Sequence, residues 1–236
     1  MTARTHDLLR LTDPAAVVPA AAPPWVAEAL EAVPWVVVRR GAAPNGHLAV
    51  GVRGPERHQR HAAWVRAGDV RCVVRPEQLR PPDDPGRDRT PALAALRAIG
   101  PVLDGSGPAW SPTGGNGLDL NPTGGNGLDL NATGGTGHDL NASGSAGPGW
   151  GPTGSAGFEL ATGHPTTTDA SDLDVIIRRD TIPTAVWAAE LRDRLPAGVD
   201  CLIETPAGGV ALAELAAGPA TVALRTGDGP RLVRAP

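Results

Sequence analysis

A ten-residue repeat near the middle of the chain limits what the whole sequence can fold into. Residues 112–131 hold two identical copies of PTGGNGLDLN, and residues 132–141 follow as ATGGTGHDLN. A segment so rich in glycine, with so few large apolar side chains, buries little surface and cannot form a core. The repeat therefore predicts a flexible loop over residues 101–149, which separates an N-terminal domain at 1–100 from a C-terminal domain at 150–236.

The same repeat has an alternative interpretation, which is calcium binding. Its GGNGLD and GGTGHD segments are similar to the Gly-Gly-x-Gly-x-Asp units of calcium-binding β-rolls. Those units are nonapeptides, and their large apolar residue comes two positions after the aspartate. In this chain the period is ten, and Leu120, Leu130 and Leu140 follow the aspartate directly. This spacing favours the flexible loop.

Charge is unevenly divided between the two parts of the chain. Residues 1–100 contain 14 arginines and 10 acidic residues, whereas residues 101–236 contain 7 arginines and 15 acidic residues. A basic half beside an acidic half suits an enzyme that binds a polyanion with one half and a metal ion with the other. Because there is no basic run and aromatic residues make up only 3% of the chain, nucleic-acid binding is not expected.

Composition also bears on location and on covalent catalysis. No apolar run reaches about 18 residues, and Arg4, His6 and Asp7 interrupt any signal peptide, so we expect a cytoplasmic protein without a membrane partner. Cys72 and Cys201 lack metal-ligand spacing and are predicted to be thiols in a reducing compartment. The chain has no lysine, which excludes a lysine nucleophile or Schiff base.

Two aspartates at the start of a predicted strand are the first candidate catalytic residues. Residues 171–177 read SDLDVII, and the β-branched run after the carboxylates favours a strand. Side chains alternate along a strand, so Asp172 and Asp174 should point to the same face. Two neighbouring carboxylates are typical ligands of Mg²⁺, which keeps coordination places for water and substrate phosphate.

A glycine-serine pair precedes these aspartates and predicts a phosphate site. Gly154 and Ser155 open a short predicted helix at residues 156–161, where backbone N–H groups and a hydroxyl suit a phosphate. In the repeat copies, Gly115, Gly125 and Gly135 replace the serine. A Gly-Ser helix start followed by an Asp-x-Asp strand resembles the nucleotidyltransferase fold. This resemblance predicts an α+β protein, with a small N-terminal α/β domain, the Gly-rich insertion, and a polymerase-β-like mixed sheet with helices.

The resemblance to nucleotidyltransferases implies a third carboxylate on a later strand, at residues 199–205. Asp200, Leu202 and Glu204 share one face of that strand, so both acidic residues stay candidates. The remaining elements expected from periodicity and turn residues are helices at 25–32, 56–66, 91–99, 183–195 and 210–217, strands at 35–40, 47–53, 70–75, 221–225 and 231–233, and a linker at 81–86.

Arginines on and after the predicted hairpin of residues 35–53 form the candidate polyanion site. One guanidinium group can bind two phosphate oxygens at once, which makes arginine suitable for binding a triphosphate or pyrophosphate. The five arginines are Arg39, Arg40, Arg53, Arg57 and Arg60.

Several segments together resemble one family, the malonate decarboxylase holo-acyl-carrier-protein synthases, also called phosphoribosyl-dephospho-CoA transferases. The matching segments are WGPTGSAGFELATG at 150–163, SDLD at 171–174, HDLL at 6–9, VVRR at 37–40, GVRG at 51–54 with Arg57 and Gln59-Arg60 after it, ETP at 204–206 and LAE at 212–214. The resemblance covers nearly the whole chain outside residues 105–149.

The resemblance implies a reaction and its participants. The donor would be 2′-(5″-triphosphoribosyl)-3′-dephospho-CoA, and the acceptor a serine on the acyl-carrier subunit of malonate decarboxylase. Asp172 and Asp174 would hold Mg²⁺, and one of the carboxylates would take the serine proton as pyrophosphate leaves. His6 and His164 are further candidate contacts. The alternatives are a nucleotidyltransferase for another acceptor, such as the citrate lyase carrier protein or a small alcohol, and a non-catalytic protein that binds through the repeat.

Overall fold

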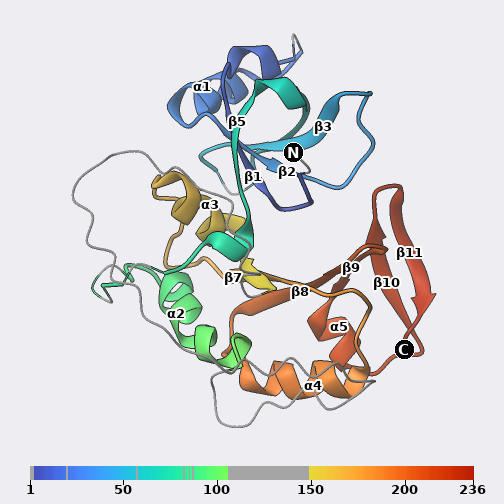
Figure 1. Ribbon diagram of the computed structural model, residues 1–236. Helices are drawn as coiled ribbons and strands as arrows, with labels where there is room; N and C mark the ends of the chain where they lie inside the picture. The colour runs from blue at the N-terminus through green and yellow to red at the C-terminus, as the bar shows by residue number, and fades with distance from the viewer. Residues whose placement is uncertain are drawn as a thin grey trace, which may run out of the picture.

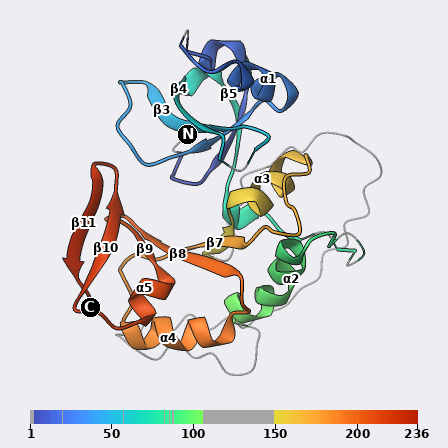
Figure 2. The ribbon, with the colours of Figure 1, turned by 180° about the vertical axis from the view of Figure 1, so that it is seen from behind.

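The protein folds around two β-sheets, one from each half of the chain. The computed structural model describes residues 3–19, 21–56, 58–81, 83–84, 86, 88–105 and 149–236. Figures 1 and 2 show the N-terminal sheet stacked on the C-terminal sheet, with α3 at their junction. The predicted α+β class with helices is confirmed. The repeat at 112–141 lies outside the described residues.

The N-terminal sheet is antiparallel and has the strand order β4-β3-β2-β1-β5. Its strands are β1 (Leu8–Leu11), β2 (Trp35–Val38), β3 (His47–Arg53), β4 (Arg60–Arg66) and β5 (Val70–Val74). Short 3-10 turns η1 (Ala15–Val17) and η2 (Ala67–Asp69) connect them, and α1 (Pro24–Ala32) packs on the sheet through Val26 and Leu30. Burial of these apolar residues gives the N-terminal half its own core.

The C-terminal sheet is mixed and has the strand order β11-β10-β9-β8-β7-β6. Its strands are β6 (Trp150–Pro152), β7 (Leu173–Arg178), β8 (Val199–Thr205), β9 (Gly208–Ala211), β10 (Thr221–Thr226) and β11 (Gly229–Arg234). Only β7 and β8 pair in parallel among these described strands. A parallel pair needs a long crossover, which contains α4 (Ala185–Arg194).

Three helices cover one face of the C-terminal sheet. They are α2 (Pro91–Leu103), α4 and α5 (Leu212–Ala216), and the last two lie below the sheet in Figure 1. Leu96, Leu191 and Leu215 from these helices lie in one buried core with Ile203 of β8. Because strand side chains alternate, the acidic positions of β7 and β8 lie on the opposite face, toward the N-terminal half.

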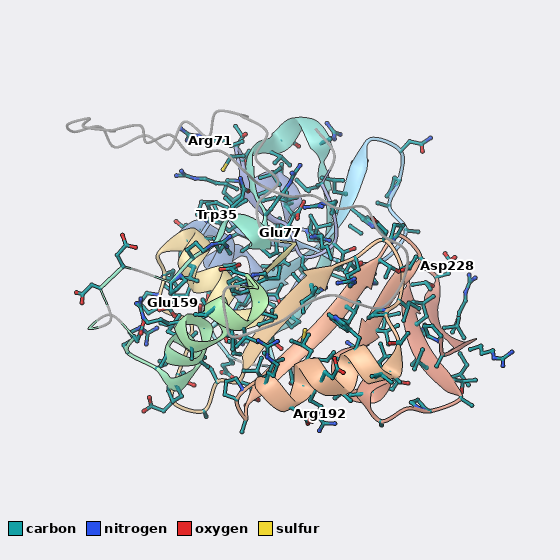
Figure 3. All side chains as sticks on the ribbon, turned by 60° about the horizontal axis from the view of Figure 1, so that its bottom comes forward. Trp35, Arg71, Glu77, Glu159, Arg192 and Asp228 are labelled. Atoms are coloured by element: carbon teal, nitrogen blue, oxygen red, sulfur yellow. The ribbon has the colours of Figure 1, made fainter. Side chains whose placement is uncertain are left out.

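The junction between the sheets is closely packed and contains a buried ion network. A Cβ atom on Gly151 of β6 would lie 1.9 Å from the carbonyl oxygen of Pro76 in η3 (Pro76–Gln78), so only glycine fits there. Arg178 of β7 pairs with Glu77, which lies at the centre of Figure 3, and with fully buried Asp7. These contacts hold the two halves in one arrangement.

The local structure differs from the sequence predictions at several places. The helix predicted at residues 56–66 is wrong, because residues 60–66 form β4 and pair along their length with β3. Ala and Arg in this segment favour a helix, but pairing with β3 outweighs that local preference. β1 and β6 were not expected, and residues 208–211 form β9 before the shorter helix α5.

The remaining predicted elements appear near the predicted bounds. No helix in the described part of the chain is long and apolar enough to cross a membrane.

Candidate functional site

Gly154 begins helix α3 (Gly154–Thr162) directly against the carboxylate of Asp174. Its φ is +58°, and a Cβ atom added to it would lie 1.9 Å from Asp174 Oδ2. The backbone N–H of Thr153 also donates to the Asp174 carbonyl at 2.8 Å. The structure therefore brings the Gly-Ser helix start and the Asp-x-Asp strand into contact, as their order in the sequence predicts.

Asp174 and Asp200 stand side by side on neighbouring parallel strands. The β7–β8 register pairs Asp174 with Asp200, and paired residues of a parallel ladder point to the same face. Both line a cavity of about 520 Å³ that also includes Thr153, His6 and Arg225. This cavity is the candidate reaction site.

Asp172 and Ser155 lie near this cavity but not in its lining. Asp172 is exposed just before β7, and its Oδ1 lies 3.9 Å from the Cβ position of Gly198. Ser155 accepts a hydrogen bond at its carbonyl from Thr166 Oγ1, at 3.0 Å. Strand alternation does not fix the direction of the Asp172 side chain, because β7 begins at Leu173.

Glu204 lies four residues beyond Asp200 on β8 and has a different environment. It forms an ion pair with Arg40, over Gly209, where a Cβ atom would meet Arg40 Nη2 at 2.5 Å. Burial raises the pKa of Glu204, although Arg40 and Arg178 oppose the shift. The register therefore separates the two candidates for the third carboxylate: Asp200 lies beside Asp174, and Glu204 lies among arginines.

A second and larger cavity, of about 830 Å³, lies between the two sheets and is rich in arginine. Its arginines come from both halves of the chain, and they are Arg4, Arg39, Arg40, Arg178, Arg179 and Arg225. The acidic residues in its lining are Asp180 and Glu204. Arg225 lines both cavities, so the arginine-rich cavity adjoins the one with Asp174 and Asp200.

The predicted arginines do not gather in one place. Arg39 and Arg40 line the arginine-rich cavity beside the His47 end of β3. Arg53 and Arg60 pair at the other end of β3, where the Arg53 guanidinium lies 6.0 Å from the ring centre of Phe158. Arg57 lies outside the described residues. These arginines are close in the sequence but separated in the structure, because the two ends of the seven-residue strand β3 face different parts of the molecule.

Two residues of the site were not assigned a firm role from the sequence. Arg225 has no motif around it, and its position follows from the pairing of β10 with β9 on one side and β11 on the other. His6 was only a further candidate contact, and it lines the cavity with Asp174 and Asp200. Positive φ at His6, 72°, is the structural signal that sequence alone does not contain. His164 is exposed after α3.

The residues present fit a magnesium ion only together with a substrate. Within the described residues, no three side chains of His, Cys, Asp or Glu come close enough together to hold a metal ion. Mg²⁺ commonly binds one or two carboxylates plus substrate phosphates. Asp174, Asp200 and the adjacent turn at Gly154 offer such a partial set of ligands.

The thiol beside this site has a raised pKa. Burial and the Asp200 charge raise the pKa of Cys201 to about 12, so it is protonated at neutral pH. Cys72 and Cys201 are both free, and only Cys201 is fully buried.

Comparison with known proteins identifies the chain's relatives. Residues 4–76 match the family described as phosphoribosyl-dephospho-CoA transferase MdcG N-terminal domain, and residues 128–236 match the corresponding C-terminal domain. A phosphoribosyl-dephospho-CoA transferase of Pseudomonas putida (strain GB-1) is 36% identical over 99% of this chain and 94% of its own length. Those of Azotobacter vinelandii and Pseudomonas aeruginosa are 38% and 36% identical, over 92% and 98% of this chain and 86% and 92% of their own lengths.

No solved structure matches the chain. The relatives are alike over nearly the full length of both partners, and both family domains are present in order. The chain is a transferase enzyme and belongs to the phosphoribosyl-dephospho-CoA transferase family.

Proposed function

We propose that this enzyme transfers the 2′-(5″-triphosphoribosyl)-3′-dephospho-CoA group to a serine on the acyl-carrier subunit of malonate decarboxylase, with release of pyrophosphate. The observation that carries the proposal is the contact of the Gly154 turn with Asp174, beside Asp200, in one cavity. A helix start against paired carboxylates suits a metal-bound triphosphate.

The shape of the binding region supports a long, highly charged donor. The cavity with Asp174 and Asp200 adjoins the arginine-rich cavity, and Arg225 belongs to both. A donor with a triphosphate at one end and a dephospho-CoA body can extend from the first cavity into the second. Guanidinium groups provide bidentate contacts to phosphate oxygens.

Mg²⁺ is the proposed cofactor, and Asp172 and Asp174 are its proposed ligands. Asp200 is close enough along the ladder to join them. When bound, the ion neutralises charge on the triphosphate and on the leaving pyrophosphate. Exposure of the three aspartates leaves their oxygens accessible to such an ion.

The chain's own residues supply orientation and proton transfer. The serine oxygen forms a bond to the innermost phosphorus, and the bond from that phosphorus to the bridging oxygen of pyrophosphate breaks. The serine proton passes to Asp200, the proposed general base, whose position beside Asp174 favours it over Glu204. N–H groups at the start of α3, near Gly154 and Ser155, hold the departing phosphates.

A nucleotidyltransferase-like fold is part of the same proposal. The C-terminal half has a mixed sheet with helices on one face and carboxylates from two parallel strands on the other. The Gly-Ser helix start lies beside those carboxylates. This arrangement supports the resemblance drawn from the sequence.

Mass spectrometry tests the proposed reaction. Apo-carrier subunit is incubated with enzyme, Mg²⁺ and the triphosphoribosyl donor. We expect the carrier to gain the phosphoribosyl-dephospho-CoA mass on one serine, with one pyrophosphate released per transfer. Transfer to the citrate lyase carrier protein but not to the malonate decarboxylase subunit would contradict the proposed acceptor.

A further inference from the structure

His6, Arg40 and Arg225 meet at the boundary between the two cavities, although they come from distant parts of the sequence. His6 precedes β1, Arg40 follows β2 and Arg225 lies on β10. His6 and Arg225 line the cavity with Asp174, while Arg40 and Arg225 line the arginine-rich cavity. The three side chains therefore occupy the passage that a donor spanning both cavities must follow.

Two polar atoms of this cluster lack partners. His6 Nε2 and Arg40 Nε are buried from solvent and have no hydrogen-bond partner among the described residues. Buried polar atoms are nearly always satisfied, and exceptions often mark a missing ligand, ion or water. An acceptor oxygen that reaches these atoms would satisfy both.

The backbone at His6 is held in an unusual conformation. Its φ is +72°, at the third position of a turn closed by Asp7 N–H donating to the Arg4 carbonyl at 3.0 Å. Glycine or asparagine usually takes this position in such turns. The Asp7 carboxylate accepts from Arg4 N–H at 2.8 Å, and Arg178 donates to the Thr5 carbonyl at 2.9 Å, which fixes the turn on both sides. Strain that is held in place by its surroundings is commonly found at functional positions.

The charge around His6 is strongly positive. Burial and the charges of Arg40, Arg178 and Arg225 together lower the pKa of His6 to about 4, so the imidazole is neutral at pH 7. Arg40 pairs with Glu204 and Arg178 pairs with Asp7 and Glu77. Arg225 is exposed and forms no salt bridge with any described residue. The cluster therefore has positive charge in excess, which attracts an anion.

We propose that His6, Arg40 and Arg225 form a second phosphate subsite, which binds the donor's non-reacting diphosphate, the one that links adenosine to pantetheine. The subsite rests on the proposed function, because that function defines the donor. The reacting triphosphate occupies the place beside Asp174 and Gly154. The diphosphate is the next anionic group along the donor, and the cluster is the next cationic group along the passage.

Two fragments of the donor separate this subsite from the reaction site. Dephospho-CoA carries the non-reacting diphosphate without a triphosphate, and tripolyphosphate with Mg²⁺ represents the reacting end. Binding of each is measured by calorimetry to the full-length protein and to the variants Arg225→Gln and His6→Asn. Asparagine tolerates positive φ but is too short to replace Nε2. Arg234→Gln, an exposed arginine on β11 outside both cavities, is the matched control.

We expect Arg225→Gln and His6→Asn each to weaken dephospho-CoA binding by about tenfold or more, which is about 1.4 kcal/mol. Their tripolyphosphate binding should stay within about threefold of wild type, and Arg234→Gln should change neither. Asp174→Asn should show the reverse pattern. Melting temperatures identify any variant that fails to fold. If His6→Asn does not fold, Arg225→Gln, which changes an exposed strand position, tests the subsite by itself.

Two results would overturn the subsite. One is dephospho-CoA binding in Arg225→Gln equal to that in Arg234→Gln. The other is a loss of tripolyphosphate affinity in Arg225→Gln and His6→Asn as large as their loss of dephospho-CoA affinity. That result would place the reacting end of the donor in the cluster. Failure of the proposed function is distinct, because it appears as a wild-type enzyme that binds both fragments but transfers nothing to the carrier subunit.

Discussion

Helix α3 can approach Asp174 closely because Gly154, at the start of the helix, has no side chain. We expect Gly154→Ala to abolish most transfer, because its Cβ would lie 1.9 Å from Asp174 Oδ2 and push the carboxylate away. Gly163→Ala is the matched control, since Gly163 also has positive φ, +72°, but nothing within 4 Å of its Cβ position. The control should lose about 1 kcal/mol of stability and keep its activity. Equal activity of the two variants would contradict the contact.

The carboxylates on β7 and β8 can be distinguished by conservative substitution. Asp174→Asn and Asp200→Asn should each lower kcat/KM by at least about a hundredfold, roughly 2.7 kcal/mol of transition-state stabilisation. Glu204→Gln should have a smaller effect, because Glu204 pairs with Arg40 away from Asp174. Asp193→Asn, an exposed position on α4, is the control. A larger loss in Glu204→Gln than in Asp200→Asn would reverse the assignment of the third carboxylate.

His6 should make stability depend on pH in the weakly acidic range. Its pKa is about 4 in the folded protein and 6.5 in the unfolded chain, so between these values the unfolded chain binds more protons. The contribution of neutral His6 to the free energy of unfolding is complete above pH 6.5. It is lost as the pH falls toward 4, and the loss is at most about 3 kcal/mol. Asp7 and Glu204, whose pKa values burial raises, oppose this trend. Urea unfolding of wild type and His6→Asn at several pH values isolates the histidine, and parallel curves would contradict the prediction.

Glu159 of helix α3, labelled in Figure 3, links the helix to segments on both sides of it in the sequence. The Glu159 carboxylate accepts from the backbone N–H groups of Thr166 and Thr167, both at 2.8 Å, and from Arg89 at 2.6 Å. Burial alone would raise the pKa of Glu159, but these hydrogen bonds hold it below its usual value. They tie down the segment that leads from α3 to Asp172.

Replacement of this carboxylate should therefore destabilise the helix and the segment after it. We expect Glu159→Gln to lower the free energy of unfolding by about 1–3 kcal/mol at pH 7, because an amide cannot accept all these bonds. Since the folded pKa is lowered, the difference from wild type should persist above pH 4.5 and disappear as the pH falls below it. Glu190→Gln, at an exposed position on α4, should change little. An unchanged urea midpoint in Glu159→Gln would contradict this role.

Across the whole molecule, the chain leaves the C-terminal half after α2 and returns at β6, and the two points are adjacent. Trp150 Nε1 donates to Asp104 Oδ1 at 2.7 Å. A segment whose ends already meet can vary in length at a cost of only a few tenths to about 1 kcal/mol, because loop closure depends on the logarithm of length. We therefore expect a change in the length of the segment between these two residues to alter stability only slightly.

Deletion of residues 112–141, three whole repeat units, should leave transferase activity within a few-fold of the parent. The repeat copies lack the serine equivalent to Ser155, and the Asp104–Trp150 contact remains. Activity is measured with the carrier subunit, and melting temperature confirms folding. A loss above about a hundredfold in a folded variant would show that the repeat takes part in the site. Calcium-dependent protection of these residues in hydrogen exchange would support the β-roll alternative.

Local patterns in the sequence were sufficient for several parts of this protein. The β-branched run after the carboxylates predicted a strand, which β7 confirms, and the Gly-Ser pair predicted a helix start, which lies against Asp174. The family was also recognisable from short segments. These features depend on neighbours in the chain, because side-chain direction and helix starts follow from local backbone geometry.

Tertiary structure alone decided the rest. The β7–β8 register placed Asp200, not Glu204, beside Asp174, and pairing with β3 made residues 60–66 a strand instead of a helix. The packing of the two sheets brought His6 and Arg225 together, which no sequence spacing indicates. Strand register and sheet packing depend on contacts between residues far apart in the chain, and a single sequence records the residues that make those contacts without recording their partners.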